Sequence, residues 1–112
     1  MIRIKINRGA DGRIVRFHVD GHAQYDERGK DIVCAGVSAV TVGTVNAIEV
    51  LTGVQLNTRM KHGFLSADIS PQTDADTDSK VQLLLEGMVV MLQSIQQSYG
   101  AYIAMQDHPS SK

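Results

Sequence analysis

Apolar and polar residues alternate at the start of the chain, and this pattern predicts two strands. Three isoleucines alternate with charged or amide residues over residues 2–7, and the same two-residue period returns over residues 15–19. This period is typical of strands that bury only one face. Because Asp11-Gly12 lies between the two runs and favours a tight turn, we predict that they form an antiparallel hairpin.

The next long segment, residues 31–51, is almost entirely small or apolar, and its length approaches that of a membrane span. Polar residues such as Ser38, Asn46 and Glu49 interrupt the run, and small residues recur along it. A strand of this length would be exceptional. We therefore predict a helix of a globular domain, buried on most sides and ending at Gly53.

A second hairpin and a second helix follow. Strands are expected over residues 54–60 and 64–69, an amphipathic helix after the acidic segment 73–78, and a last short strand over residues 102–106. The order β-β-α-β-β-α-β predicts an α+β fold, a layered sandwich in which a mixed sheet packs with two long helices. We expect a single domain over residues 1–106 and a loose tail over residues 107–112.

Composition and charge narrow the class of protein. The net charge of the 112-residue chain is −1 with both signs interspersed, which argues against direct binding of nucleic acid. A single cysteine excludes an internal disulfide and fits a reducing compartment. The first residues lack the continuous apolar region of a signal peptide. We therefore expect a cytoplasmic protein that does not bind membranes.

The candidate chemistry lies in residues 21–38, where a polar loop carries His22 and the following helix carries Cys34, the only cysteine. If Asp31 caps that helix, Cys34 is its third residue, where unpaired backbone N–H groups and the helix dipole stabilise a thiolate. His22 could then act as general base and acid. The amides of Cys34 and Ala35 are candidates to hold an oxyanion.

The same residues allow other interpretations. A lone cysteine on an apolar helix is often a structural core residue, and a lone loop histidine is often merely exposed. His18, His22 and Cys34, with Asp31, could instead form a zinc site. Ser38 could bond near the sulfur or to its own helix backbone. Loop 21–30 could be a functional flap or a solvated connector, and we expect His62 to be exposed in a tight turn and His108 to lie in the tail.

The pattern GHAxYxxxGxDIVCAxVSA, which runs from Gly21 to Ala39, resembles the signature of Prp, a bacterial family of ribosomal-processing cysteine proteases. The likeness extends over about residues 1–106. It implies a small cytosolic endopeptidase that removes the N-terminal extension of the large-subunit ribosomal protein numbered twenty-seven. Carried onto this sequence, Cys34 is the nucleophile, His22 is its base, and Asp31 and Ser38 have supporting roles.

The resemblance has further implications. Residues Gly21, Ala23, Tyr25 and Gly29 would belong to a substrate-binding loop that orders when a peptide binds. The long helix of residues 31–51 would pack against its symmetry mate in a homodimer. No cofactor and no metal are expected. The main alternative is a non-catalytic module for ribosome assembly or protein interaction, in which Cys34 is structural.

Overall fold

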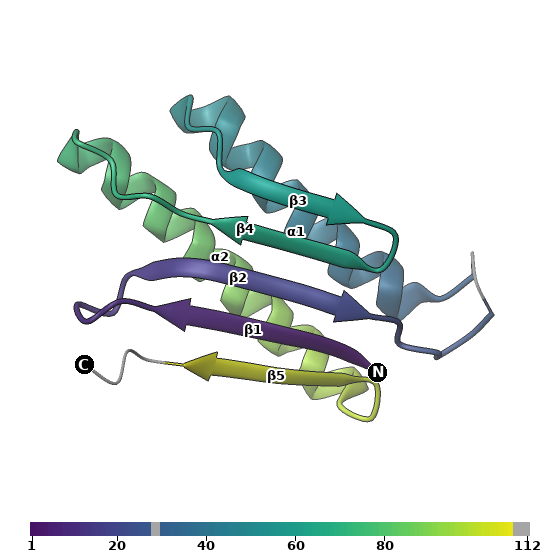
Figure 1. Ribbon diagram of the computed structural model, residues 1–112. Coiled ribbons are helices and arrows are strands. Elements are labelled where there is room, and N and C mark those ends of the chain that lie inside the picture. Colours follow the sequence, from purple (N-terminus) through teal and green to yellow (C-terminus); the bar gives the residue numbers. More distant parts are fainter. Residues whose placement is uncertain (28–29, 109–112) are drawn as a thin grey trace.

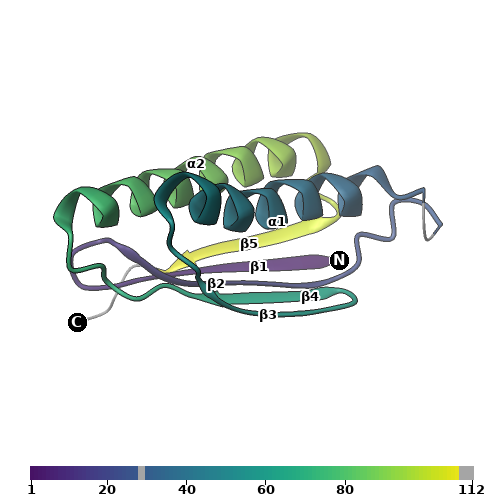
Figure 2. The same ribbon diagram turned by 90° about the horizontal axis from the view of Figure 1, so that it is seen from above.

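The structure is a computed structural model that describes residues 1–27 and 30–108. A five-stranded sheet carries two long helices side by side on one of its faces (Figures 1 and 2). In chain order the elements are β1 (Ile2–Arg8), β2 (Ile14–Gly21), α1 (Ile32–Thr52), β3 (Asn57–Lys61), β4 (Phe64–Asp68), α2 (Ala75–Tyr99) and β5 (Ile103–His108). The predicted element order and α+β class are confirmed.

The strand order β3-β4-β2-β1-β5 joins the two hairpins into one sheet. β1 pairs with β5 in parallel, and the other three pairings are antiparallel. The central β2–β4 pairing aligns Asp20 with Phe64, and the backbone N–H of Gly21 donates to the carbonyl oxygen of Gly63 at 3.0 Å. This pairing places the β3–β4 turn beside the end of β2, where His22 follows.

β5 extends further than expected, to His108. Asp107 lies opposite Ile6 in the parallel pairing, and its Oδ1 accepts a hydrogen bond from Arg8 Nε at 2.8 Å. Arg8 also forms an ion pair with Glu86 of α2, so this side chain of β1 links β5 to α2. Residues 107 and 108 therefore belong to the sheet and not to a loose tail, and residues 109–112 lie outside the described part of the chain.

The core lies between the helices and the covered face of the sheet. The alternating isoleucines of β1 are at most 2% exposed, whereas the charged residues between them face solvent. α2 contributes a stripe of buried residues at helical spacing, which satisfies its amphipathic pattern. These core residues of α2 are Val81, Leu85, Met88, Val89 and Leu92.

α1 begins at the predicted cap, Asp31, and ends at Gly53, as the sequence indicates. The prediction that it is buried on most sides is wrong. Its buried residues form one stripe, because α1 and α2 make a single layer and the outer face of α1 is not covered by the described chain. Val50 and Leu51 on that face are 80% and 69% exposed. By length and composition alone α1 could cross a membrane, but in this fold it packs along α2. The buried stripe of α1, which faces the core, consists of Val33, Val37, Thr41, Thr44 and Ile48.

Candidate active site

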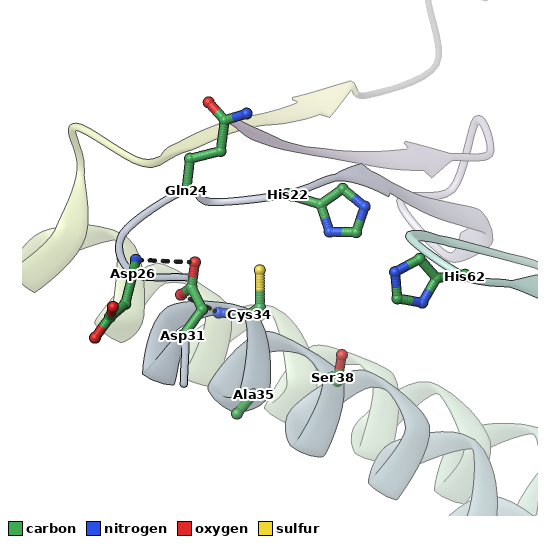
Figure 3. A pocket seen from close by; sticks show the side chains of 8 residues that line it. All are labelled: His22, Gln24, Asp26, Asp31, Cys34, Ala35, Ser38 and His62. Carbon is green, nitrogen blue, oxygen red and sulfur yellow. Dashed lines mark hydrogen bonds between the residues drawn. The ribbon is translucent and has the colours of Figure 1, made fainter. Parts of the chain in front are cut away.

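A cavity of about 570 Å³ opens where the end of β2, the first turns of α1 and the β3–β4 turn converge (Figure 3). The cavity brings together the predicted site residues of the loop and of the helix start. It also contains a histidine for which the sequence predicts no place in the site. Its lining residues are His22, Gln24, Asp26, Asp31, Cys34, Ala35, Ser38 and His62.

Asp31 joins the loop to the helix. Its Oδ1 accepts hydrogen bonds from the backbone N–H groups of Val33 and Cys34, both at 3.0 Å. Its Oδ2 accepts from the backbone N–H groups of Tyr25, at 2.9 Å, and Asp26, at 3.4 Å. Burial opposes the charged form, but these four N–H groups outweigh it and lower the pKa of Asp31. The predicted cap is confirmed, and it also fixes the path of the loop.

The sulfur of Cys34 lies at the start of α1 and faces the cavity. Cys34 is the third helical residue and is partly exposed, and its Sγ accepts a hydrogen bond from the backbone N–H of Ala23 at 3.2 Å. His22 therefore precedes the residue that contacts the sulfur, and Figure 3 shows one ring nitrogen of His22 on the side of Cys34. In the described residues no hydrogen bond joins the two side chains, a separation that apo sites often show.

The amides expected to hold an oxyanion are already engaged. The N–H of Cys34 donates to the Asp31 carboxylate, and the N–H of Ala35 donates to the Asp31 carbonyl oxygen at 3.0 Å. The expectation fails because the same cap that forms the helix start also consumes its first donors. The backbone N–H that does contact the sulfur of Cys34 belongs to Ala23, which is 3% exposed.

His62 is exposed, as expected, but it also lines the cavity, which the sequence does not indicate. Its ring centroid lies 5.1 Å from that of His22, with the planes inclined by 38°. The signal that could have found it is the pairing of β2 with β4, which brings the two segments together. Ser38, one helical turn after Cys34, is exposed in the cavity, and its hydroxyl makes no hydrogen bond within the described residues.

The four predicted loop residues have different positions. Gly21 has φ +91°, and a Cβ there would collide with the carbonyl oxygen of Met1, so this position requires glycine. Ala23 is buried against Cys34. The Tyr25 ring packs edge-on against two aromatic rings, 5.6 Å from Tyr99 and 5.2 Å from Tyr102, and does not line the cavity. Gly29 lies outside the described residues.

His18 does not join the site. It lies within β2, where its Nε2 is 3.0 Å from Asp20 Oδ2, and its ring centroid lies 5.0 Å from that of Phe64. In the part of the chain that the structure describes, no group of three or more histidine, cysteine, aspartate and glutamate side chains is arranged to hold a metal ion. The zinc interpretation therefore has no support from the geometry.

Comparison with known proteins shows to which family of enzymes this chain belongs. The profile of the family described as cysteine protease Prp matches residues 1–104. A ribosomal processing cysteine protease Prp from Bacillus subtilis (strain 168) is 41% identical over 101 residues, which cover 88% of this chain and 90% of the relative. The chain belongs to the cysteine protease Prp family. It is thus a cysteine protease of a ribosomal-processing family, and the non-catalytic interpretation is set aside.

Solved Prp structures agree with the fold. The crystal structure of an essential ribosomal processing protease Prp from S. aureus, in complex with a covalently linked product peptide, superposes with a TM-score of 0.87 at 34% identity. The comparison covers 96% of this chain and 100% of that one. A second structure of the S. aureus protease, with a substrate peptide, gives a TM-score of 0.80 at the same identity and coverage.

Proposed function

We propose that this Prp protease removes the N-terminal extension of the large-subunit ribosomal protein numbered twenty-seven, with Cys34 as nucleophile and His22 as general base and acid. The observation that carries the proposal is the placement of the only cysteine at a helix start, in one cavity with His22. The S. aureus relatives, solved with a substrate peptide and with a covalently linked product peptide, support peptide cleavage through a covalent intermediate.

The chemistry divides into two steps. In the first, the imidazole of His22 takes the proton of the Cys34 thiol, and the thiolate attacks the carbonyl carbon of the scissile amide. The C–N bond then breaks as His22 returns the proton to the leaving amine, which leaves a thioester on Cys34. In the second, His22 takes a proton from water as the water oxygen attacks the thioester carbonyl, the C–S bond breaks to release the acid product, and His22 returns the proton to the sulfur of Cys34.

Several groups around the sulfur serve these steps. The N–H of Ala23 and the positive end of α1 stabilise the thiolate before attack. Asp31 acts indirectly, since its carboxylate fixes both the helix start and the loop after His22. Ser38 presents a hydroxyl one helical turn from Cys34, where it can hydrogen-bond to a bound peptide.

The proposal includes the expected homodimer in the cytoplasm, where ribosomes assemble. The outer faces of α1 and α2 support a second copy as partner, because Leu83, Val90 and Met91 are 71%, 60% and 46% exposed there. Light scattering tests this directly. A mass of twice the chain supports the dimer, and a monomeric mass contradicts it.

The test of the function uses a peptide that spans the junction between the extension and the mature ribosomal protein. Under reducing conditions the wild-type protein should produce one N-terminal and one C-terminal fragment, identified by mass spectrometry. Cys34→Ala and His22→Ala should each lose at least about 10³-fold in activity. His108→Ala, a histidine at the end of β5, is the matched control and should cleave normally. An inert wild type, or a Cys34→Ala variant that cleaves, contradicts the proposal.

A further inference from the structure

The turn between β3 and β4, residues His62 and Gly63, packs directly against the histidine of the site. The ring of His62 lies beside that of His22, and the carbonyl oxygen of Gly63 accepts a hydrogen bond from the N–H of Gly21. The residue that precedes His22 is therefore tied to the turn by the backbone. This connection follows from the β2–β4 pairing and requires no side chain of the turn.

Gly63 makes the closest approach. A Cβ built on Gly63 would lie 2.7 Å from Nε2 of His22 and 3.0 Å from its Cε1, distances at which one of the two groups must move. The backbone φ of Gly63 is +74°, so the turn itself also favours glycine. The backbone of the turn thus lies against one edge of the His22 imidazole, and only glycine at position 63 leaves room for the ring.

The contact with this turn determines which edge of the His22 ring faces the sulfur of Cys34. In Figure 3 the two ring nitrogens of His22 lie on different sides of the ring, one on the side of Cys34 and the other away from it. Nε2 is the nitrogen against the turn, which leaves Nδ1 on the side of Cys34. A base must be held in this way to receive a proton from one defined direction.

We propose that the His62-Gly63 turn is the positioning element for the His22 imidazole, and that Gly63 is its positioning residue. The inference rests on the proposed function, in which His22 is the general base. It adds a residue far from the sequence signature of residues 21–39, one that acts only through His22. Neither residue of the turn was assigned a role by the sequence.

Gly12 offers a matched control. It lies in the β1–β2 turn with φ +85°, and a Cβ built on it meets nothing within 4 Å. Gly12→Ala and Gly63→Ala therefore impose the same kind of backbone strain in a hairpin turn, but only Gly63→Ala drives a methyl group into His22. Any difference between the two variants reports the collision and not the strain.

The activity test compares these two variants on the junction peptide. Gly63→Ala should lower kcat at least about tenfold with KM within about twofold, because peptide binding is kept and the base is displaced. Gly12→Ala should leave both constants within about twofold of the wild type. Equal kcat values for Gly63→Ala and Gly12→Ala would overturn the proposal.

A stability cycle gives a readout that needs no catalysis. Gly63→Ala should lower the melting temperature more than Gly12→Ala in the wild type, and the difference should vanish in a His22→Ala background, where the space is open. If Gly63→Ala folds only together with His22→Ala, the proposal is supported in its strongest form. If Gly63→Ala is equally damaging with and without His22, the turn does not act through that ring. Because the cycle stands even when no peptide is cleaved, it separates failure of this proposal from failure of the proposed function.

Discussion

The two helices of this protein begin in the same way, and their first turns have different side chains. α1 is capped by Asp31 and α2 by Asp74, and both caps have φ −80° with extended backbone. Each carboxylate accepts a hydrogen bond from the N–H of the third helical residue. That residue is Cys34 in α1 and Thr77 in α2, so the same cap precedes the proposed nucleophile in one helix and, in the other, a hydroxyl that donates to the cap itself.

The charges of the two first turns also differ. α2 carries Asp76 and Asp78 there, whereas the first turn of α1 contains no acidic residue. Carboxylates stabilise a helix start by occupying its positive end. In α2 acidic side chains occupy that end, whereas under the proposed mechanism the first turn of α1 leaves it to the Cys34 thiolate. Under the proposed mechanism, the reactivity of Cys34 therefore depends on the absence of acidic residues from the first turn of α1 as much as on the cysteine itself.

The largest expected effect comes from exchanging one atom at the third helical position. Cys34→Ser should lower cleavage at least about 10³-fold, because an unactivated hydroxyl is a far weaker nucleophile than a thiolate. Thr77→Ser at the matching position of α2 should leave cleavage within about twofold. Peptide cleavage followed by chromatography measures both, and substantial activity in Cys34→Ser would break the comparison.

Removal of each cap should separate stability from function. Asp31→Ala should lower the free energy of unfolding by about 1 kcal/mol, the usual cost of losing an N-cap, and Asp74→Ala should lower it for the same reason. Only Asp31→Ala should also lower kcat/KM, by about 10- to 100-fold, because Asp31 holds the N–H groups of both Cys34 and Tyr25. Chemical denaturation and peptide cleavage report the two effects, and an equal loss of activity in both variants would contradict this account.

An acidic residue added to the first turn of α1 should make it resemble α2. Ile32 is 56% exposed, so a polar side chain at this position would remain in contact with solvent. Ile32→Glu should slow alkylation of Cys34 by iodoacetamide about two- to fivefold, because a carboxylate competes with the thiolate for the helix start at about 0.3–1 kcal/mol. Ile32→Gln is the neutral control, and identical rates for the two variants would argue against the role of the charge.

The smallest expected effect is a change in how the stability of the protein depends on acidic pH, through the ion pair of Arg13 with Asp78 at the start of α2. Arg13 donates two hydrogen bonds to Asp78, at 2.9 and 3.0 Å, and these lower the pKa of Asp78 together with the N–H of Gln72. A lowered folded-state pKa gives stability that is present above the unfolded value of about 3.9 and is lost as pH falls through the folded pKa. The melting temperature of Asp78→Asn should therefore fall less than that of the wild type as the solution is acidified below about pH 4. Parallel curves would mean that the ion pair contributes nothing measurable.

The sequence predicts local features well and long-range ones poorly. The alternation in β1, the cap at Asp31 and the end of α1 at Gly53 depend on neighbouring residues, and all three are confirmed. Whether α1 is buried on one side or on most sides depends on how many layers surround it, which its own residues do not encode.

The site shows the same division. His22 and Cys34 are twelve positions apart, and the sequence predicts that they share a site only if the loop between them folds back over the helix start, as it does here. The place of His62 and Gly63 beside His22 depends on the pairing of β2 with β4, which are not consecutive strands. The oxyanion expectation failed for a local reason, because the amides of Cys34 and Ala35 already donate to Asp31.

The central claim is that the thiol of Cys34 performs the cleavage, and a single cysteine makes a direct test possible. Iodoacetamide should modify the chain once, and the fraction of protein modified, read by intact mass, should equal the fraction of peptide cleavage lost at every time point. Protein that is fully alkylated at Cys34 and still cleaves the junction peptide would contradict the account.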